Sequence, residues 1–263
     1  MKPSLTISIV TMLFASGAAV AAPPDTADVE REGRSDTISA VAMRGAFLPL
    51  TLGASVRGQR AVALGLGGYD SARGQGTFEA AAEVGVWGPF AIRGGAVYAH
   101  ATGTVRPSVG ARVQGLAEAR QGVDAALGVF YRPEGLTEAE GEVETIVSLG
   151  RHVGQTYLLG NLAYGQDPEG NERDGELRLA GLRQVRERAV FGLDGRLRFD
   201  LGSSAAKLAL KHEATLDLAA GPTASVFVGP IALLAQAGAS AVRFSGANLR
   251  FGAFGTLGAG TSF

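Results

Sequence analysis

Three polar side chains are of the kinds that a hydrolase combines in its active site. Ser148 and His152 lie on one segment of the chain, and Asn161 lies on the next. A nucleophile and its base must lie within hydrogen-bond reach of each other. On an extended segment, Ser148 and His152 would be about 13 Å apart. We therefore expect no catalytic site here and do not expect an enzyme.

Two glycine-rich stretches could be mistaken for phosphate-binding loops. They read GLGGYDSARGQG (65–76) and GTLGAG (255–260). Neither matches G-x-G-x-x-G between a strand and a helix, and neither matches G-x-x-x-x-G-K-[ST]. No convincing helical period occurs after residue 60. We therefore expect no nucleotide cofactor.

Metal and nucleic-acid sites are also disfavoured. The chain has no cysteine, and its three histidines, His100, His152 and His212, are far apart. This pattern excludes Cys-ligated zinc and makes a His-based metal site improbable. With 24 basic and 25 acidic residues, the chain lacks the basic footprint of a nucleic-acid-binding protein. We expect no cofactor, no metal and no nucleic acid.

The N-terminus predicts export. Lys2 precedes the apolar run LTISIVTMLFASGAAV, and Ala19-Val20-Ala21 matches a cleavage site, which predicts a signal peptide over residues 1–21. A transmembrane anchor is disfavoured because PPDTADVEREG follows the run at once. No later stretch has the 18 or so consecutive apolar residues of a spanning helix. The mature protein is therefore exported, and is either soluble or inserted as strands.

From about residue 60 the chain alternates apolar and polar residues with a period of two. In FGLDGRLRFDL, Phe191 and Leu193 share one face while Asp194 and Arg196 share the other. Such a segment extends roughly 35 Å, which is enough to cross a bilayer core when tilted. Twelve segments are predicted: 60–70, 76–87, 90–101, 104–117, 121–132, 140–151, 154–165, 174–186, 188–201, 205–219, 223–243 and 248–263.

The connections fall into two alternating classes. One is tight: Gly88-Pro89, AEARQ, RHVG, VRER and AAGP. The other includes the longest, most polar loops: DSARGQ, RPEGLTEAEG and GQDPEGNERDG. Short turns on one rim and longer loops on the other are typical of outer-membrane barrels, with the short set periplasmic. Gly229-Pro230 falls inside segment 223–243, where we expect a β-bulge because proline cannot donate to the ladder.

Residues 59–263 resemble the bacterial outer-membrane β-barrel (porin-like) proteins, although no specific family is identified. The features that carry the resemblance are the signal peptide, the dyad repeat, the two loop classes and the terminal Phe263. The resemblance implies an all-β, antiparallel up-and-down transmembrane barrel of about 12 strands in the cell outer membrane. It also implies that outer-membrane lipid surrounds the barrel, and that the insertion machinery reads Phe263 as an insertion signal.

The N-terminal part of the mature chain, residues 22–58, is expected to be a periplasmic or lumen-lying segment. Its stretch DTADVEREGRSD reads as a disordered linker. The stretch Gly45 to Val56 could be a further strand; paired with DTISAVAM it would make fourteen. The sequence does not indicate an oligomeric state.

Aromatic residues near the strand ends predict a belt at the membrane interface, because amphipathic rings favour that depth. The predicted belt comprises Tyr98, Tyr131, Tyr164 and Phe90. Tyr69 falls outside the apolar phase unless Gly67-Gly68 carries a bulge.

The polar phase predicts an interior with both signs of charge. The lumen-lining residues would be Glu79, Glu83, Arg93, Arg106, Arg112, Asp124, Arg132, Glu142, Glu144, Glu176, Arg178, Asp194, Arg196, Arg198, Asp200, Lys207, Lys211, Glu213, Asp217 and Arg250. Unpaired buried charges are costly, so we expect them to pair, for example Arg112 with Asp124.

These charges favour a narrow channel for small polar solutes, because charged walls tune permeation. Small inward residues such as Ala126, Gly128, Gly110 and Gly252 would leave volume for water. The alternatives are a salt-bridged structural barrel without a pore, an export-related translocator, and a secreted soluble β-sandwich.

Overall fold

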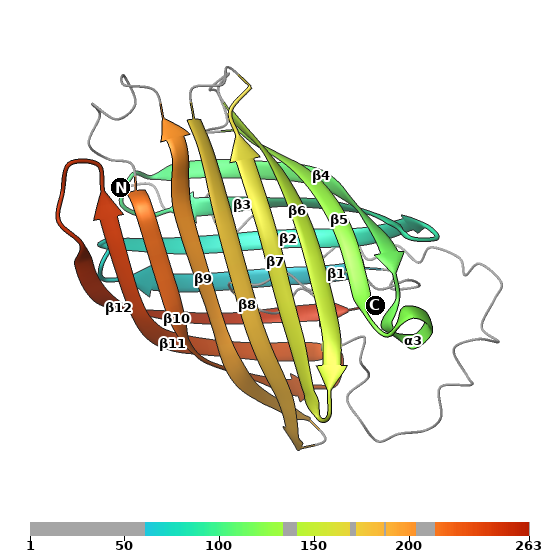
Figure 1. The fold of residues 1–263 in the computed structure, drawn as a ribbon. Helices are drawn as coiled ribbons and strands as arrows, with labels where there is room; N and C mark the ends of the chain where they lie inside the picture. The colour runs from blue at the N-terminus through green and yellow to red at the C-terminus, as the bar shows by residue number, and fades with distance from the viewer. Residues whose placement is uncertain (1–60, 134–140, 169–171, 187, 204–213, 263) are drawn as a thin grey trace, which may run out of the picture. The chain divides into compact units, whose positions relative to one another are not determined.

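Twelve antiparallel strands close into a barrel in the computed structural model (Figure 1). The structure describes residues 61–133, 141–168, 172–186, 188–203 and 214–262. Each strand pairs with the next, and β1 pairs with β12. The strands are β1 (Ala61–Asp70), β2 (Gln75–Trp87), β3 (Phe90–Ala99), β4 (Thr104–Leu116), β5 (Asp124–Pro133), β6 (Gly141–Val153), β7 (Thr156–Gln166), β8 (Glu172–Arg186), β9 (Ala189–Ser203), β10 (Ala214–Val228), β11 (Ile231–Phe244) and β12 (Arg250–Ser262). The predicted all-β barrel of 12 strands is confirmed.

The one helix among the described residues is short. It is α3 (Glu118–Gln121), in the connection between β4 and β5. No helix in the described part of the chain is long and apolar enough to span a membrane. The predictions for residues 1–60, including the signal peptide, the segment 22–58 and the possible strand at Gly45 to Val56, lie outside the described residues, as does Phe263.

Two strand boundaries differ from the prediction, although the strand count is unchanged. Residues 219–222, AAGP, lie inside β10 rather than in a turn. The ladder between β10 and β11 skips from Ala220↔Ala239 to Thr223↔Gln236, and this gap accommodates Pro222, which has no N–H to donate. Gly229-Pro230 is the turn between β10 and β11, not a bulge, and Gly229 has φ 60°.

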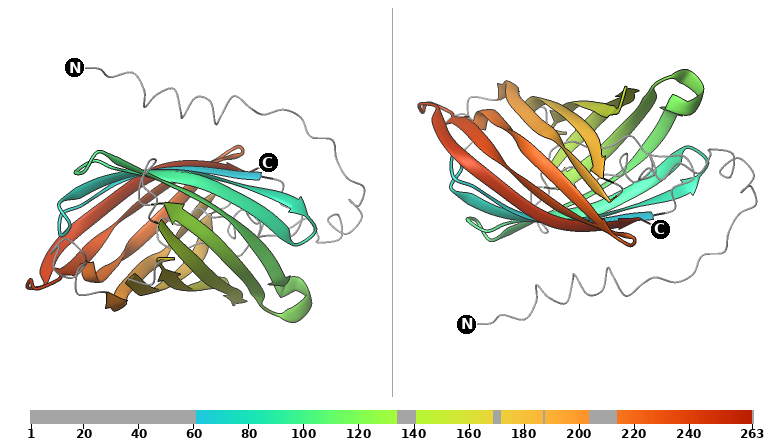
Figure 2. Two further views of the ribbon diagram at one scale, coloured as in Figure 1. Left: turned by 90° about the horizontal axis from the view of Figure 1, so that it is seen from above. Right: turned by 90° about the horizontal axis from the view of Figure 1, so that it is seen from below.

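Connections of two residues alternate with longer ones around the barrel, and the α3 connection between β4 and β5 is the exception. Two-residue turns at 88–89, 154–155, 187–188 and 229–230, together with the α3 connection, join strands at one end. The longer connections, including 134–140 and 204–213, join strands at the other end. We call these the short-turn end and the long-loop end. Figure 2 shows the strands from two further directions, with those of opposite walls crossing at a steep angle.

The two faces of the barrel wall differ sharply in chemistry. Large apolar side chains cover the outer face: Leu193 is 65% exposed, Leu257 is 70% exposed and Phe251 is 79% exposed. Asp194 and Asp217 face inward and are almost fully buried. This is the reverse of a soluble protein, in which apolar side chains fill the inside. The period-two pattern of β9 therefore predicted its two faces correctly.

A close approach of β10 and β11 requires glycine on both strands. A Cβ at Gly221 would lie 2.1 Å from the carbonyl oxygen of Ala237, and one at Gly238 would lie 2.2 Å from that of Ala220. Both contacts are with backbone atoms, so a side chain at either position would force the two strands apart.

We predict that Gly238→Val lowers the free energy of unfolding by about 3 kcal/mol, because the added atoms overlap the backbone of β10. Urea unfolding of the protein folded in detergent micelles, followed by tryptophan fluorescence, measures the change. Gly255→Val is the matched control, because the nearest atom to its Cβ position is 3.9 Å away. Equal stabilities of the two variants would contradict the close approach.

Candidate functional site

The barrel interior carries a polar network that begins at the turn between β1 and β2. Asp70 accepts hydrogen bonds from the backbone N–H of Ala72 and from the hydroxyl of Ser240 on β11. Ser71 and Ala253 on β12 exchange hydrogen bonds. Ala72 is 3% exposed. This turn therefore folds over β12 and β11 instead of extending away from the barrel.

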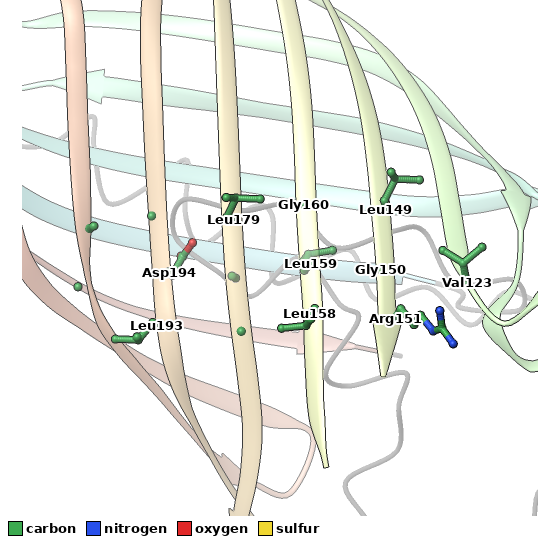
Figure 3. A pocket seen from close by; sticks show the side chains of 15 residues that line it. Val123, Leu149, Gly150, Arg151, Leu158, Leu159, Gly160, Leu179, Leu193 and Asp194 are labelled. Atoms are coloured by element: carbon green, nitrogen blue, oxygen red, sulfur yellow. The ribbon is translucent and has the colours of Figure 1, made fainter. Parts of the chain in front are cut away.

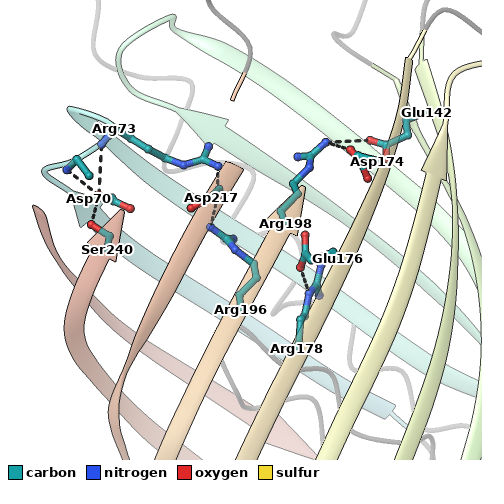
Figure 4. A network of polar contacts seen from close by, with 11 residues as sticks. Asp70, Arg73, Glu142, Asp174, Glu176, Arg178, Arg196, Arg198, Asp217 and Ser240 are labelled. Carbon is teal, nitrogen blue, oxygen red and sulfur yellow. Dashed lines mark hydrogen bonds and ion pairs between the residues drawn. The ribbon is translucent and has the colours of Figure 1, made fainter. Parts of the chain in front are cut away.

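The same turn places a guanidinium at β10, the strand next to β11. Arg73 forms an ion pair with Asp217 on β10, and Arg196 on β9 reaches the same carboxylate oxygen at 2.6 Å (Figure 4). The side chain of Asp217 is 1% exposed, so two arginines share one buried carboxylate. Because a buried carboxylate needs compensation, this contact holds the turn and β9 to β10.

A second part of the network runs along β5 to β9. Arg178 pairs with Glu176 and lies 3.8 Å from Glu144 on β6, which in turn binds Arg132 at 2.7 Å. Arg198 pairs with Asp174 and lies 4.0 Å from Glu142. Figure 4 shows the part of this network formed by Glu142, Asp174, Glu176, Arg178 and Arg198.

A further part of the network lies on β2 to β5. Arg112 binds Glu83 at 2.9 Å, and Arg93 lies 3.5 Å from Glu79. Asp124, which begins β5 near the short-turn end, accepts hydrogen bonds from the hydroxyl of Tyr157 at 3.0 Å, and from an amide and a backbone N–H nearby. The sequence did not predict the contacts of Arg112 with Glu83 and of Asp124 with Tyr157.

Many of these contacts join strands that are two apart. Tyr157 on β7 reaches Asp124 on β5, Arg178 on β8 reaches Glu144 on β6, and Arg112 on β4 reaches Glu83 on β2. Such a bridge must pass over the strand between, so the side chain lies along the wall instead of pointing at the barrel axis. Small residues provide the room: a Cβ at Gly150, on β6, would lie 2.1 Å from the hydroxyl oxygen of Tyr157.

Phe130 shows the same arrangement with an apolar ring. It lies over Gly128 on its own strand and over Gly110, its partner on β4; Cβ atoms there would come within 2.7 Å and 2.4 Å of the ring. The sequence suggested that inward glycines such as Gly110 and Gly128 leave volume for water. In the structure, the space beside them is filled by neighbouring side chains. The glycines receive these side chains and keep them flat.

Near the short-turn end the inner wall is more apolar. One cluster contains Tyr157, Leu159, Ala180, Leu182 and Val190, and a second contains Leu66, Ala232 and Leu234. Phe227 packs against both clusters. Toward the short-turn end the inner wall is thus apolar on β7 to β11, whereas β2 to β5 carry the buried charges Glu83, Arg93, Arg112 and Asp124 there.

Comparison with known proteins identifies the fold. No protein-family model matches the chain, and no curated protein matches it. Among solved structures, the NanC porin superposes with a TM-score of 0.55 at 9% identity, covering 76% of this chain and 100% of that one. This chain has a porin-type barrel fold. The KdgM porin superposes with a TM-score of 0.50 at 9% identity over 77% of this chain and 99% of that one.

Most of the predicted interior residues of the porin-type barrel are buried or half-buried. This group comprises Glu79, Glu83, Arg93, Arg112, Asp124, Arg132, Glu142, Glu144, Glu176, Arg178, Asp194, Arg196, Arg198, Asp200 and Asp217. Two others, Arg106 and Arg250, are exposed near the long-loop end, and the guanidinium of Arg250 lies over the ring of Phe244. They belong to the rim rather than to the interior. Lys207, Lys211 and Glu213 lie outside the described residues.

The three side chains considered for a hydrolase fall into two separate contacts. Asn161 donates to the hydroxyl of Ser148 at 2.6 Å, because the two are cross-strand partners. The ring of His152 instead contacts Glu118 of α3 at 2.7 Å. No group of three potential metal ligands occurs among the described residues.

The aromatic residues of the predicted belt lie on the outer face, near strand ends. Tyr131 is 36%, Tyr164 42% and Phe90 45% exposed, and Tyr98 is half-buried. Tyr69 is 57% exposed, and β1 reaches it without the bulge considered at Gly67-Gly68. The sequence did not single out Trp87, which stacks on Phe90 at the short-turn end.

The shared carboxylate of Asp217 yields a stability test. We predict that Asp217→Asn lowers the free energy of unfolding by about 3 kcal/mol, because Arg73 and Arg196 lose their common counter-charge. Adding Arg73→Gln should restore part of the loss, and urea unfolding in micelles measures both. The control is Asp200→Asn on the neighbouring strand. A loss no larger than that of the control would show that the pair does not hold the turn.

Proposed function

We propose that the protein is an outer-membrane channel for small polar solutes. The observation that carries the proposal is the wall-following network: side chains such as Tyr157, Arg178 and Arg112 bridge alternate strands instead of projecting toward the axis. A barrel that used its interior only as a core would interdigitate side chains across the middle. The apolar outer face and the likeness to NanC and KdgM porins support placement in the outer membrane.

The charges of the interior favour solutes that are small and polar rather than strongly charged. One KdgM porin structure is described as a complex with disordered oligogalacturonate; its TM-score is 0.51 at 10% identity, over 77% of this chain and 99% of that one. Here most of the described arginines of the interior are already paired with carboxylates. We therefore propose slight selectivity and no dedicated site for a polyanion.

The proposal includes the targeting signals expected from the sequence. Residues 1–21 would direct export, and Phe263 would be read by the insertion machinery. Lipid would contact the outer face, with Tyr98, Tyr131, Tyr164 and Phe90 at its interfaces.

A second candidate function is a structural barrel without a continuous pore. Two observations favour it: the apolar clusters joined by Phe227, and the inward-folded turn at Arg73. Apolar constrictions can close a channel by dewetting. Conductance separates the two candidates.

We expect the purified protein to form discrete conducting steps in planar bilayers. Arg73→Ala should raise the conductance of each step, by about twofold if the turn is the narrowest point, because the turn loses its tether to Asp217. Arg173→Ala, which removes an exposed arginine of β8, is the control and should leave the steps unchanged. Absence of any step at moderate salt would overturn the channel in favour of the structural barrel.

Membrane insertion itself is tested on the outer face. Leu162 lies midway along β7 and is 58% exposed. In a soluble protein Leu162→Arg would be nearly neutral, but at the bilayer midplane we expect a loss of about 2 to 4 kcal/mol. Urea unfolding from phospholipid vesicles measures the loss. Val153→Arg, at the short-turn rim, should cost at most about 1 kcal/mol. Equal small effects would contradict insertion.

A further inference from the structure

A groove lies on the outer face of the wall, toward the short-turn end. It has a volume of about 760 Å³, within the range of ligand sites. Its described lining comes from β6 to β10 and from Val123, just before β5, and is almost wholly apolar; Figure 3 shows its side chains. Leu149, Leu158, Leu179 and Leu193 project outward from β6, β7, β8 and β9, each at least 47% exposed.

Glycines on the same face form the floor between these leucines. Gly181 on β8 is the cross-strand partner of both Leu158 and Leu193. Gly160 and Gly195 are likewise the two cross-strand partners of Leu179. The leucine side chains therefore project beyond the glycines of the neighbouring strands, which leaves a recess between them.

One end of the groove is cationic. Arg151, on the outer face of β6 next to the short turn at 154–155, is exposed and lines the groove. It forms no ion pair with any residue that the structure describes, and the nearby carboxylate of Glu118 is engaged by His152. Arg183 follows Gly181 by two residues on the same face and is oriented by Gln155 at 2.7 Å. Three more exposed arginines lie at this end of the barrel: Arg120, Arg186 and Arg188.

We infer that this groove binds one anionic phospholipid, with an acyl chain along the leucines and the phosphate at Arg151. The inference rests on insertion in a membrane, where this face meets acyl chains. A guanidinium binds phosphate oxygens in a bidentate manner, and basic residues at the membrane rim recognise anionic headgroups. The groove is lined by leucines along its length and by Arg151 near the short-turn rim, so its apolar and cationic parts match the acyl chain and the headgroup of one lipid. A second copy of this chain would bring the same arginines together, which charge repulsion disfavours.

The test is native mass spectrometry of the folded protein, delipidated in detergent and then titrated with palmitoyl-oleoyl phosphatidylglycerol or with the phosphatidylcholine of the same chains. We expect the phosphatidylglycerol to bind about tenfold more tightly: both lipids carry the phosphate, but the choline cation of phosphatidylcholine offsets its charge and is repelled by the arginines. Arg151→Gln should remove the preference. Gly181→Val should fill the groove and weaken both lipids about tenfold; its Cβ position has 3.5 Å to the nearest atom, so the barrel can accept it.

Matched controls separate the groove from the rest of the surface. Arg173→Gln removes an exposed arginine at the long-loop end of β8, and Gly94→Val makes the same exchange on exposed β3; both should bind lipid as the parent does. Heat-dependent gel mobility confirms that each variant is folded. Equal affinity for the two lipids, or unchanged binding in Arg151→Gln and Gly181→Val, would overturn the inference. A dimer of the parent protein that Gly181→Val converts to a monomer would also overturn it, because a second copy of the chain would then occupy the groove. Lipid binding is measured independently of conductance, so failure of the proposed channel and failure of this inference can be told apart.

Discussion

The unbroken backbone ladder is the constraint on which the rest of this structure depends. β1 pairs with β12 as well as with β2, so no strand keeps an open edge. In hydrocarbon every unsatisfied N–H or C=O costs several kcal/mol, and closure removes these costs together. Closure also explains the close contact of β10 and β11 at Gly221 and Gly238: the sheet must curve, and glycine allows two backbones to approach.

Closure fixes where the polar side chains can go. Alternate side chains of each strand face inward, and the charged ones that lie against the wall are not solvated by bulk water. They are paired along the circumference, through bridges such as Arg178–Glu144 and Arg112–Glu83 that pass over small residues. These bridges tie alternate strands together, so they stabilise the curvature that closure demands. The same arrangement keeps long side chains out of the middle, which connects stability to the proposed channel.

The turn at residues 71–74 connects the long-loop end of the barrel to this network. It depends on contacts from three strands, of which Arg73 with the buried Asp217 is the most costly to break. A residue in a short polar turn thus controls part of the interior wall. The outer face has a different organisation, with leucines between glycines and an arginine at the short-turn rim.

The sequence by itself determined the fold class, the strand number, the alternation of connection lengths and the face of most charges. The faces follow from a period of two along one strand, as in Phe191 to Leu201. The strand number and the connection lengths follow from counting such segments and the residues between them. None of these requires knowledge of which strands pair. The prolines at AAGP and Gly229-Pro230 were misassigned, because whether a proline ends a strand depends on whether the neighbouring ladder offers a gap. Only the tertiary structure decided the pairs: Arg112 with Glu83, Tyr157 with Asp124, and Arg73 with Asp217. Register and barrel curvature set these distances, and neither quantity is encoded in the pattern of a single strand.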